Sequence, residues 1–129
     1  MSKAKILVAE DDPADLDLFQ EFLESQGYDV TAASDGNRAL HLGASGQFDL
    51  VILDIHMPLY DGVEVLHMLR KRFLRRPIRV MAVTADVNSK LHDQMDLESV
   101  DSFVTKPIET RTLGDLIRGF LAEAEASVR

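Results

Sequence analysis

The side chains in this sequence that could do chemistry share one property: each stands at the end of a short apolar run. They are Glu10 and Asp11 (after residues 5–9), Asp54 (ending residues 49–54), Thr84 (ending residues 78–84) and Lys106 (after residues 101–105). Carboxylates gathered at one place repel one another, so they need a cation to remain ionised together. Because all the candidate ligands are oxygens, the set favours a hard ion, Mg²⁺ or else Mn²⁺.

Asp54 is the candidate nucleophile. It ends the most apolar of the runs, so we expect its carboxylate to be the most desolvated. Aspartate carboxylates act as phosphoryl acceptors in enzymes that form acyl phosphates. Transfer also needs a cation to neutralise the phosphoryl oxygens and a hydroxyl donor, and Lys106 and Thr84 are of the required types. The combination predicts phosphoryl transfer to Asp54.

Each of these residues also has an ordinary structural explanation. An acidic run before a helix is often a cap, and we assign that role to Asp12, which precedes Pro13. Thr84 could be a simple β-branched strand residue, and Lys106 before a proline could mark a turn. The functional interpretation is favoured because one residue of each necessary type stands at the end of a different apolar run.

The elements that must position these side chains alternate along the chain. Apolar segments at residues 5–9, 28–33, 49–54, 78–84 and 101–105 are expected strands, and amphipathic segments at 13–26, at 36–45, from 62 onward, at 87–98 and from 110 onward are expected helices. Strands that are apolar throughout are typical of a parallel sheet covered on both faces. The pattern predicts an α/β fold whose site lies beyond the carboxyl ends of the strands.

Composition narrows the class of protein. The 129 residues, 46% of them hydrophobic, suit a single domain over residues 1–129, with a core at about 5–121 and a polar tail at 122–129. A formal charge of −8 disfavours nucleic acid and anionic membranes as partners, and the basic run at residues 70–76 is assigned to a helix end facing solvent. With no cysteine and no targeting or membrane segment recognised, we expect a cytoplasmic protein.

The motif set resembles that of bacterial response regulator receiver domains, over residues 5 to 120. The matching positions are Glu10-Asp11, Asp54 within DIHMP, Asp61-Gly62, Thr84-Ala85 and Lys106-Pro107. The resemblance implies a flavodoxin-like doubly wound (βα)5 fold with strand order 2-1-3-4-5. It also implies Asp54 as phosphoacceptor, Asp11 as a direct Mg²⁺ ligand, Glu10 acting through water, and the backbone carbonyl of His56 as a further ligand.

The resemblance assigns further roles around the phosphoryl group. Thr84 and Lys106 would hold it, and the peptide bond before Pro107 would be cis. Phe103 occupies the place of the family's switching aromatic residue, so we expect Thr84 and Phe103 to move together and remodel the surface made by the helix at 87–98, the strand at 101–105 and the last helix. His56 and Asp86 would tune the lifetime of the acyl phosphate.

The predicted function is therefore a phosphorelay switch, similar to stand-alone chemotaxis and sporulation regulators rather than a turnover enzyme. A histidine kinase or phosphotransfer protein would phosphorylate it, and a downstream protein would bind the changed surface. The chain would be a monomer or a weak dimer through that switching surface. Alternatively it is a receiver fragment of a hybrid kinase or transcriptional regulator. An aspartyl-phosphate phosphohydrolase is disfavoured because His56 stands where a second carboxylate is wanted, and a flavin protein because acids follow the first strand.

Overall fold

The computed structural model describes residues 3–55, 62–72, 78–85 and 100–128. Within them the strands are β1 (Lys5–Ala9), β2 (Asp29–Ala33), β3 (Leu50–Asp54), β4 (Arg79–Thr84) and β5 (Ser102–Thr105), and the helices are α1 (Pro13–Ser25), α2 (Gly36–Gly43), α3 (Gly62–Arg72) and α5 (Thr110–Val128). All five predicted strands are confirmed. The helix predicted at residues 87–98 lies outside the described residues.

The strands form one parallel sheet in the order β2-β1-β3-β4-β5, which confirms the implied order. β1 and β3 are central, so their carboxyl ends, where Glu10 and Asp54 stand, lie next to each other. β4 and β5 continue the sheet on the side of β3, with Thr84 paired to Thr105. The sheet therefore brings the chemically active positions to one edge.

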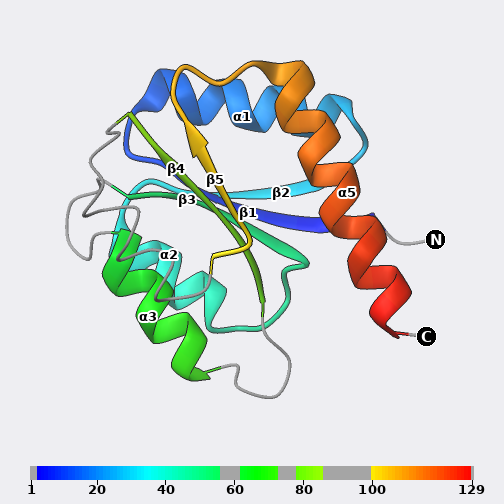
Figure 1. Ribbon diagram of the computed structural model, residues 1–129. Helices are drawn as coiled ribbons and strands as arrows, with labels where there is room; N and C mark the ends of the chain where they lie inside the picture. The colour runs from blue at the N-terminus through cyan, green and yellow to red at the C-terminus, as the bar shows by residue number, and fades with distance from the viewer. Residues whose placement is uncertain (1–2, 56–61, 73–77, 86–99, 129) are drawn as a thin grey trace.

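Helices cover both faces of this sheet, with α1 and α5 on one side and α2 and α3 on the other (Figure 1). Alternate residues of a strand point to opposite faces, so the core divides into two clusters. In β1 and β3, Leu7 and Leu53 pack toward α2 and α3, whereas Ile6 and Ile52 pack toward α1 and α5. All four side chains are almost completely buried, which explains why these strands are apolar throughout.

The start of α1 is fixed by its cap. Asp12 has extended backbone angles (φ −79°, ψ 117°), and its Oδ1 accepts a hydrogen bond from the backbone N–H of Ala14 at 3.0 Å. Pro13, the first helical residue, needs no backbone hydrogen bond there. The capping role predicted for Asp12 is thus confirmed, and the cap sets α1 directly after the acidic pair.

α5 continues to Val128, so the helix predicted from Thr110 onward includes most of the polar segment at residues 122–129. One expectation needs correction. Arg70, assigned with its basic neighbours to solvent, is only partly exposed and pairs with Asp101 at 3.3 Å, while Asp101 also accepts a hydrogen bond from the backbone N–H of Val80 at 2.7 Å. This pairing ties α3 to the segment entering β5. No helix among the described residues has the length and apolar character that crossing a membrane requires.

Candidate functional site

Three carboxylates meet at the carboxyl ends of β1 and β3. Glu10 and Asp11 follow β1, Asp54 ends β3, and one oxygen from each lies within 4.8 Å of the others. Glu10 and Asp54 are 1% and 4% exposed, whereas Asp11 is exposed. The cluster therefore combines two desolvated carboxylates with one that faces solvent, an arrangement that a cation can reach from outside.

The two oxygens of the inner carboxylate, Glu10, differ in the hydrogen bonds that they accept. Oε1 accepts hydrogen bonds from the backbone N–H of Asp12 at 3.2 Å and from Nζ of Lys106 at 3.0 Å. Oε2 is also buried, but it accepts no hydrogen bond, because the Lys106 ammonium approaches it at 2.9 Å without hydrogen-bond geometry. A buried carboxylate oxygen with spare lone pairs is chemically suited to a cation or a water bound to one.

The protonation of Glu10 reflects this environment. Burial is the main cause that raises its pKa, from 4.5 to about 7, and a hydrogen bond with the Asp54 side chain and the charge of Asp54 raise it further. Hydrogen bonds from Lys106 and from the Asp12 backbone act in the opposite direction. Without a cation, the cluster at neutral pH therefore retains a proton on this carboxyl group for part of the time.

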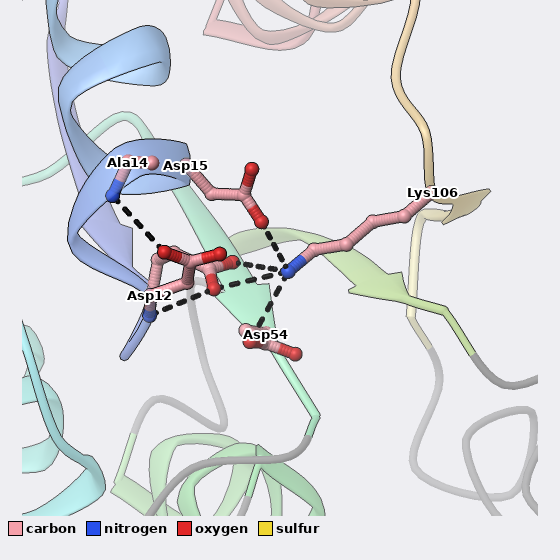
Figure 2. Close-up of polar contacts among 6 residues, drawn as sticks. Asp12, Ala14, Asp15, Asp54 and Lys106 are labelled. Carbon is pink, nitrogen blue, oxygen red and sulfur yellow. Dashed lines mark hydrogen bonds and ion pairs between the residues drawn. The ribbon is translucent and has the colours of Figure 1, made fainter.

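Lys106 supplies the positive charge of the site, directly after β5. Its Nζ lies 3.0 Å from Oδ2 of Asp15 and 3.6 Å from Oδ2 of Asp54, in addition to its contacts with Glu10 (Figure 2). Burial of the ammonium lowers its pKa, but hydrogen bonds to Glu10 and Asp15 and the charges of Asp54 and Glu10 more than offset this, so the pKa is raised. Lys106 remains charged under all ordinary conditions.

The peptide bond between Lys106 and Pro107 is cis, as the resemblance implies. The backbone N–H of Lys106 donates a hydrogen bond to the carbonyl oxygen of Thr84 at 2.8 Å, which joins the ends of β4 and β5. Thr84 is fully buried, and Phe103, on β5, is partly buried against the cluster that faces α2 and α3. Thr84 and Phe103 thus lie on adjacent strands, with Thr84 at the carboxyl end of β4 and Phe103 nearer the surface.

The structure brings Glu10, Asp11, Asp54 and Lys106 together, with Thr84 at the end of the next strand. Two predicted site residues, His56 and Asp86, lie outside the described residues. His56 is expected to bind the metal through its backbone carbonyl, and both are expected to tune the lifetime of the acyl phosphate. Sequence reasoning missed Asp15, which contributes a fourth carboxylate from the first turns of α1. No local signal in the sequence marks this contact, because it depends on how α1 lies against the end of β5.

The residues present fit a hard divalent cation. The three clustered oxygens come from carboxylates, Oε2 of Glu10 is buried and accepts no hydrogen bond although it pairs with Lys106, and the summed negative charge of the three groups exceeds what Lys106 can neutralise. Oxygen-only sites with few protein ligands suit Mg²⁺, which keeps several waters. Glu10, Asp11 and Asp54 are the described residues that would hold it.

Comparison with known proteins places this geometry in a family. A family model described as the response regulator receiver domain matches residues 6–118. The chain is 35% identical over 122 residues to the alkaline phosphatase synthesis transcriptional regulatory protein PhoP of Bacillus subtilis, an alignment covering 94% of this chain and 50% of that protein. It is 32% identical over 124 residues to the peroxide stress-activated histidine kinase Mak3 of Schizosaccharomyces pombe, covering 92% of this chain and 5% of that protein. The chain thus spans half or less of these relatives.

Solved structures agree. A CheY-like response regulator receiver domain protein from Methanospirillum hungatei matches with a TM-score of 0.91 at 29% identity, covering 98% of this chain and 99% of that one. The receiver domain of the sensor histidine kinase PA1611 from Pseudomonas aeruginosa, determined with magnesium in its active site cleft, matches with a TM-score of 0.85 over 94% of this chain and 99% of that one; at 22% identity this likeness shows the fold alone. By its sequence over residues 6–118 and by its fold, the chain belongs to the response regulator receiver domain family of two-component signalling.

Proposed function

We propose that the chain is a phosphorelay switch that accepts a phosphoryl group on Asp54. The observation that carries this proposal is the position of Asp54: a buried carboxylate at the end of a central strand, with two further carboxylates beside it and the Lys106 ammonium 3.6 Å from its Oδ2. A desolvated carboxylate beside a fixed cation is suited to attack phosphorus. The phosphoryl donor would be a phosphohistidine on a kinase or phosphotransfer protein.

In the transfer, a carboxylate oxygen of Asp54 forms a bond to phosphorus while the bond from phosphorus to the histidine nitrogen breaks. The imidazole takes up a proton as it leaves, and an acyl phosphate remains on Asp54. Lys106 neutralises part of the charge on the phosphoryl oxygens, and the Thr84 hydroxyl donates a hydrogen bond to one of them. Hydrolysis of the acyl phosphate by water later restores the Asp54 carboxylate. The chain would therefore catalyse only its own phosphorylation and dephosphorylation and would not be a turnover enzyme.

Mg²⁺, for which Mn²⁺ could substitute, would be held by Glu10, Asp11, Asp54 and the expected carbonyl of His56, and when bound it supplies positive charge that offsets the carboxylates and the phosphoryl oxygens. Oε2 of Glu10, which is buried and accepts no hydrogen bond, and the excess of negative charge support this assignment. Asp11, which is exposed, is positioned on the side from which an ion can enter.

The output would be a change of surface around β5. Movement of Thr84 toward the phosphoryl group would leave space beside it, into which Phe103 could turn, because the ring is only partly buried in the unphosphorylated structure. A downstream protein, or a second copy bound weakly through the same surface, would read this change. We expect the chain to work in the cytoplasm, either alone or as a segment of a longer regulator, as its coverage of PhoP and Mak3 allows.

Intact mass spectrometry tests the acceptor. Incubation with acetyl phosphate and Mg²⁺ should add the mass of one phosphoryl group to the wild type, because attack by Asp54 displaces acetate. Excess chelator should abolish the addition, and Asp54→Asn should show none. Asp49→Asn, an exposed aspartate in the same segment, serves as the matched control and should react normally. Equal phosphorylation of Asp54→Asn would refute the assignment.

A further inference from the structure

The Lys106 ammonium is shared between α1 and the acceptor. It donates hydrogen bonds to Oε1 of Glu10 and Oδ2 of Asp15, both at 3.0 Å, whereas Oδ2 of Asp54 lies at 3.6 Å, beyond ordinary hydrogen-bond distance. Figure 2 shows the Asp15 carboxylate directed from α1 at the tip of the lysine chain. In the unphosphorylated state the ammonium is therefore held closer to the β1–α1 segment than to the acceptor.

Asp15 differs from the other acids around Lys106. Its side chain is 37% exposed, against 6% for that of Asp54 and 1% for that of Glu10. Asp15 is also separate from the three-carboxylate group that could hold a cation. Its contact with the site is through the lysine, so it can affect the reaction by controlling where that ammonium lies.

We infer that Asp15 is a positioning residue that holds Lys106 on the α1 side of the site and competes with the phosphorylated acceptor for the ammonium. This rests on the proposed function of Asp54. An acyl phosphate carries more negative charge than the free carboxylate, so it draws Lys106 toward β3. That movement lengthens or breaks the ion pair between Lys106 and Asp15. The interaction energy lost with this pair opposes formation of the phosphorylated state.

The size of the effect follows from exposure. A partly exposed ion pair contributes little, so loss of the Asp15 carboxylate should strengthen binding of a phosphoryl analogue about twofold to fivefold. A direct ligand of the phosphoryl group or cation would produce a far larger change in the opposite direction. A small increase in affinity for the analogue is what we expect from a residue that competes for Lys106.

Calorimetric titration of the whole chain with beryllium trifluoride at saturating Mg²⁺ measures this competition, because the analogue occupies the place of the phosphoryl group. Asp15→Asn should bind it about twofold to fivefold more tightly than the wild type. Asp15→Glu, which keeps the charge, should remain close to the wild type. Asp17→Asn is the matched control, since Asp17 is exposed on the opposite side of α1 and its replacement removes the same charge.

A double-mutant cycle separates positioning from simple charge. In a Lys106→Met background, Asp15→Asn should leave the affinity unchanged, because no ammonium remains to be released. The same gain with and without Lys106, or an equal gain in Asp17→Asn, would overturn the role of Asp15. If Lys106→Met does not fold, the comparison of Asp15→Asn with Asp15→Glu and Asp17→Asn decides alone. Absence of any binding by the wild type would instead refute Asp54 as acceptor, and the inference with it.

Discussion

Replacing Glu10 with glutamine should alter how the stability of the metal-free protein depends on pH. In the folded chain the pKa of Glu10 is raised from 4.5 to about 7, chiefly by burial. Between these values the folded state binds more protons at this position than the unfolded state does. The associated stability is fully present below pH 4.5 and is lost as the pH rises through 7.

The structure sets the magnitude. A rise in pKa from 4.5 to about 7 corresponds to at most about 3 kcal/mol of unfolding free energy lost between acid and alkaline pH. Glutamine has nearly the same shape and does not ionise, so Glu10→Gln should lack this component. The variant should therefore gain stability relative to the wild type between pH 5 and pH 8. Added Mg²⁺ should stabilise the wild type more at pH 8, where fewer protons compete for the carboxylate.

Urea denaturation followed by circular dichroism, with chelator present at several values between pH 5 and pH 8, measures the effect. Glu21→Gln is the control, since Glu21 is an exposed glutamate on α1 and its removal changes the net charge equally. The quantity to compare is the difference in unfolding free energy between each variant and the wild type. Parallel pH profiles for the wild type and Glu10→Gln would refute the argument that burial of Glu10 stores this free energy.

Three further outcomes are expected. Gly43→Ala should lower the unfolding free energy measured in urea by about 1–3 kcal/mol, because the added methyl group would lie 3.0 Å from Cδ2 of Leu69. Gly119→Ala, on α5 with open space around it, should raise the unfolding free energy by about 0.5–1 kcal/mol. A more stable Gly43→Ala than Gly119→Ala would contradict this account of the packing. Asp101→Asn should cost about 1–3 kcal/mol by weakening the links from β4 and two arginines, and it should leave Mg²⁺ affinity, measured by calorimetry, unchanged. Lys106→Ala should fold and accept a phosphoryl group but lack the phosphorylation-dependent NMR shifts of β5, and shifts like those of the wild type would exclude it as the coupling cation.

The strands were predictable because central parallel strands are buried on both faces and leave continuous apolar runs such as Leu50–Asp54. The convergence of their polar ends followed from the geometry of parallel sheets, so the acidic cluster could be anticipated without coordinates. The contact of Asp15 with Lys106 could not, because it depends on how α1 is set against β5, a tertiary relation with no local signal. Arg70 was misassigned for the same reason, since its partner Asp101 is 31 residues away.

The ion pair between Lys106 and Glu10 joins positions 96 residues apart, close to the two ends of the fold. During synthesis the acidic residues after β1 leave the ribosome long before the lysine that neutralises them. β5 is the last strand made and lies at the edge of the sheet, so a nascent chain can build the other strands around carboxylates that still lack their counter-ion. The site is therefore complete only once β5 and the lysine that follows it have joined the sheet, and a chain that ends before Lys106 would hold the carboxylate cluster without the ammonium that pairs with it.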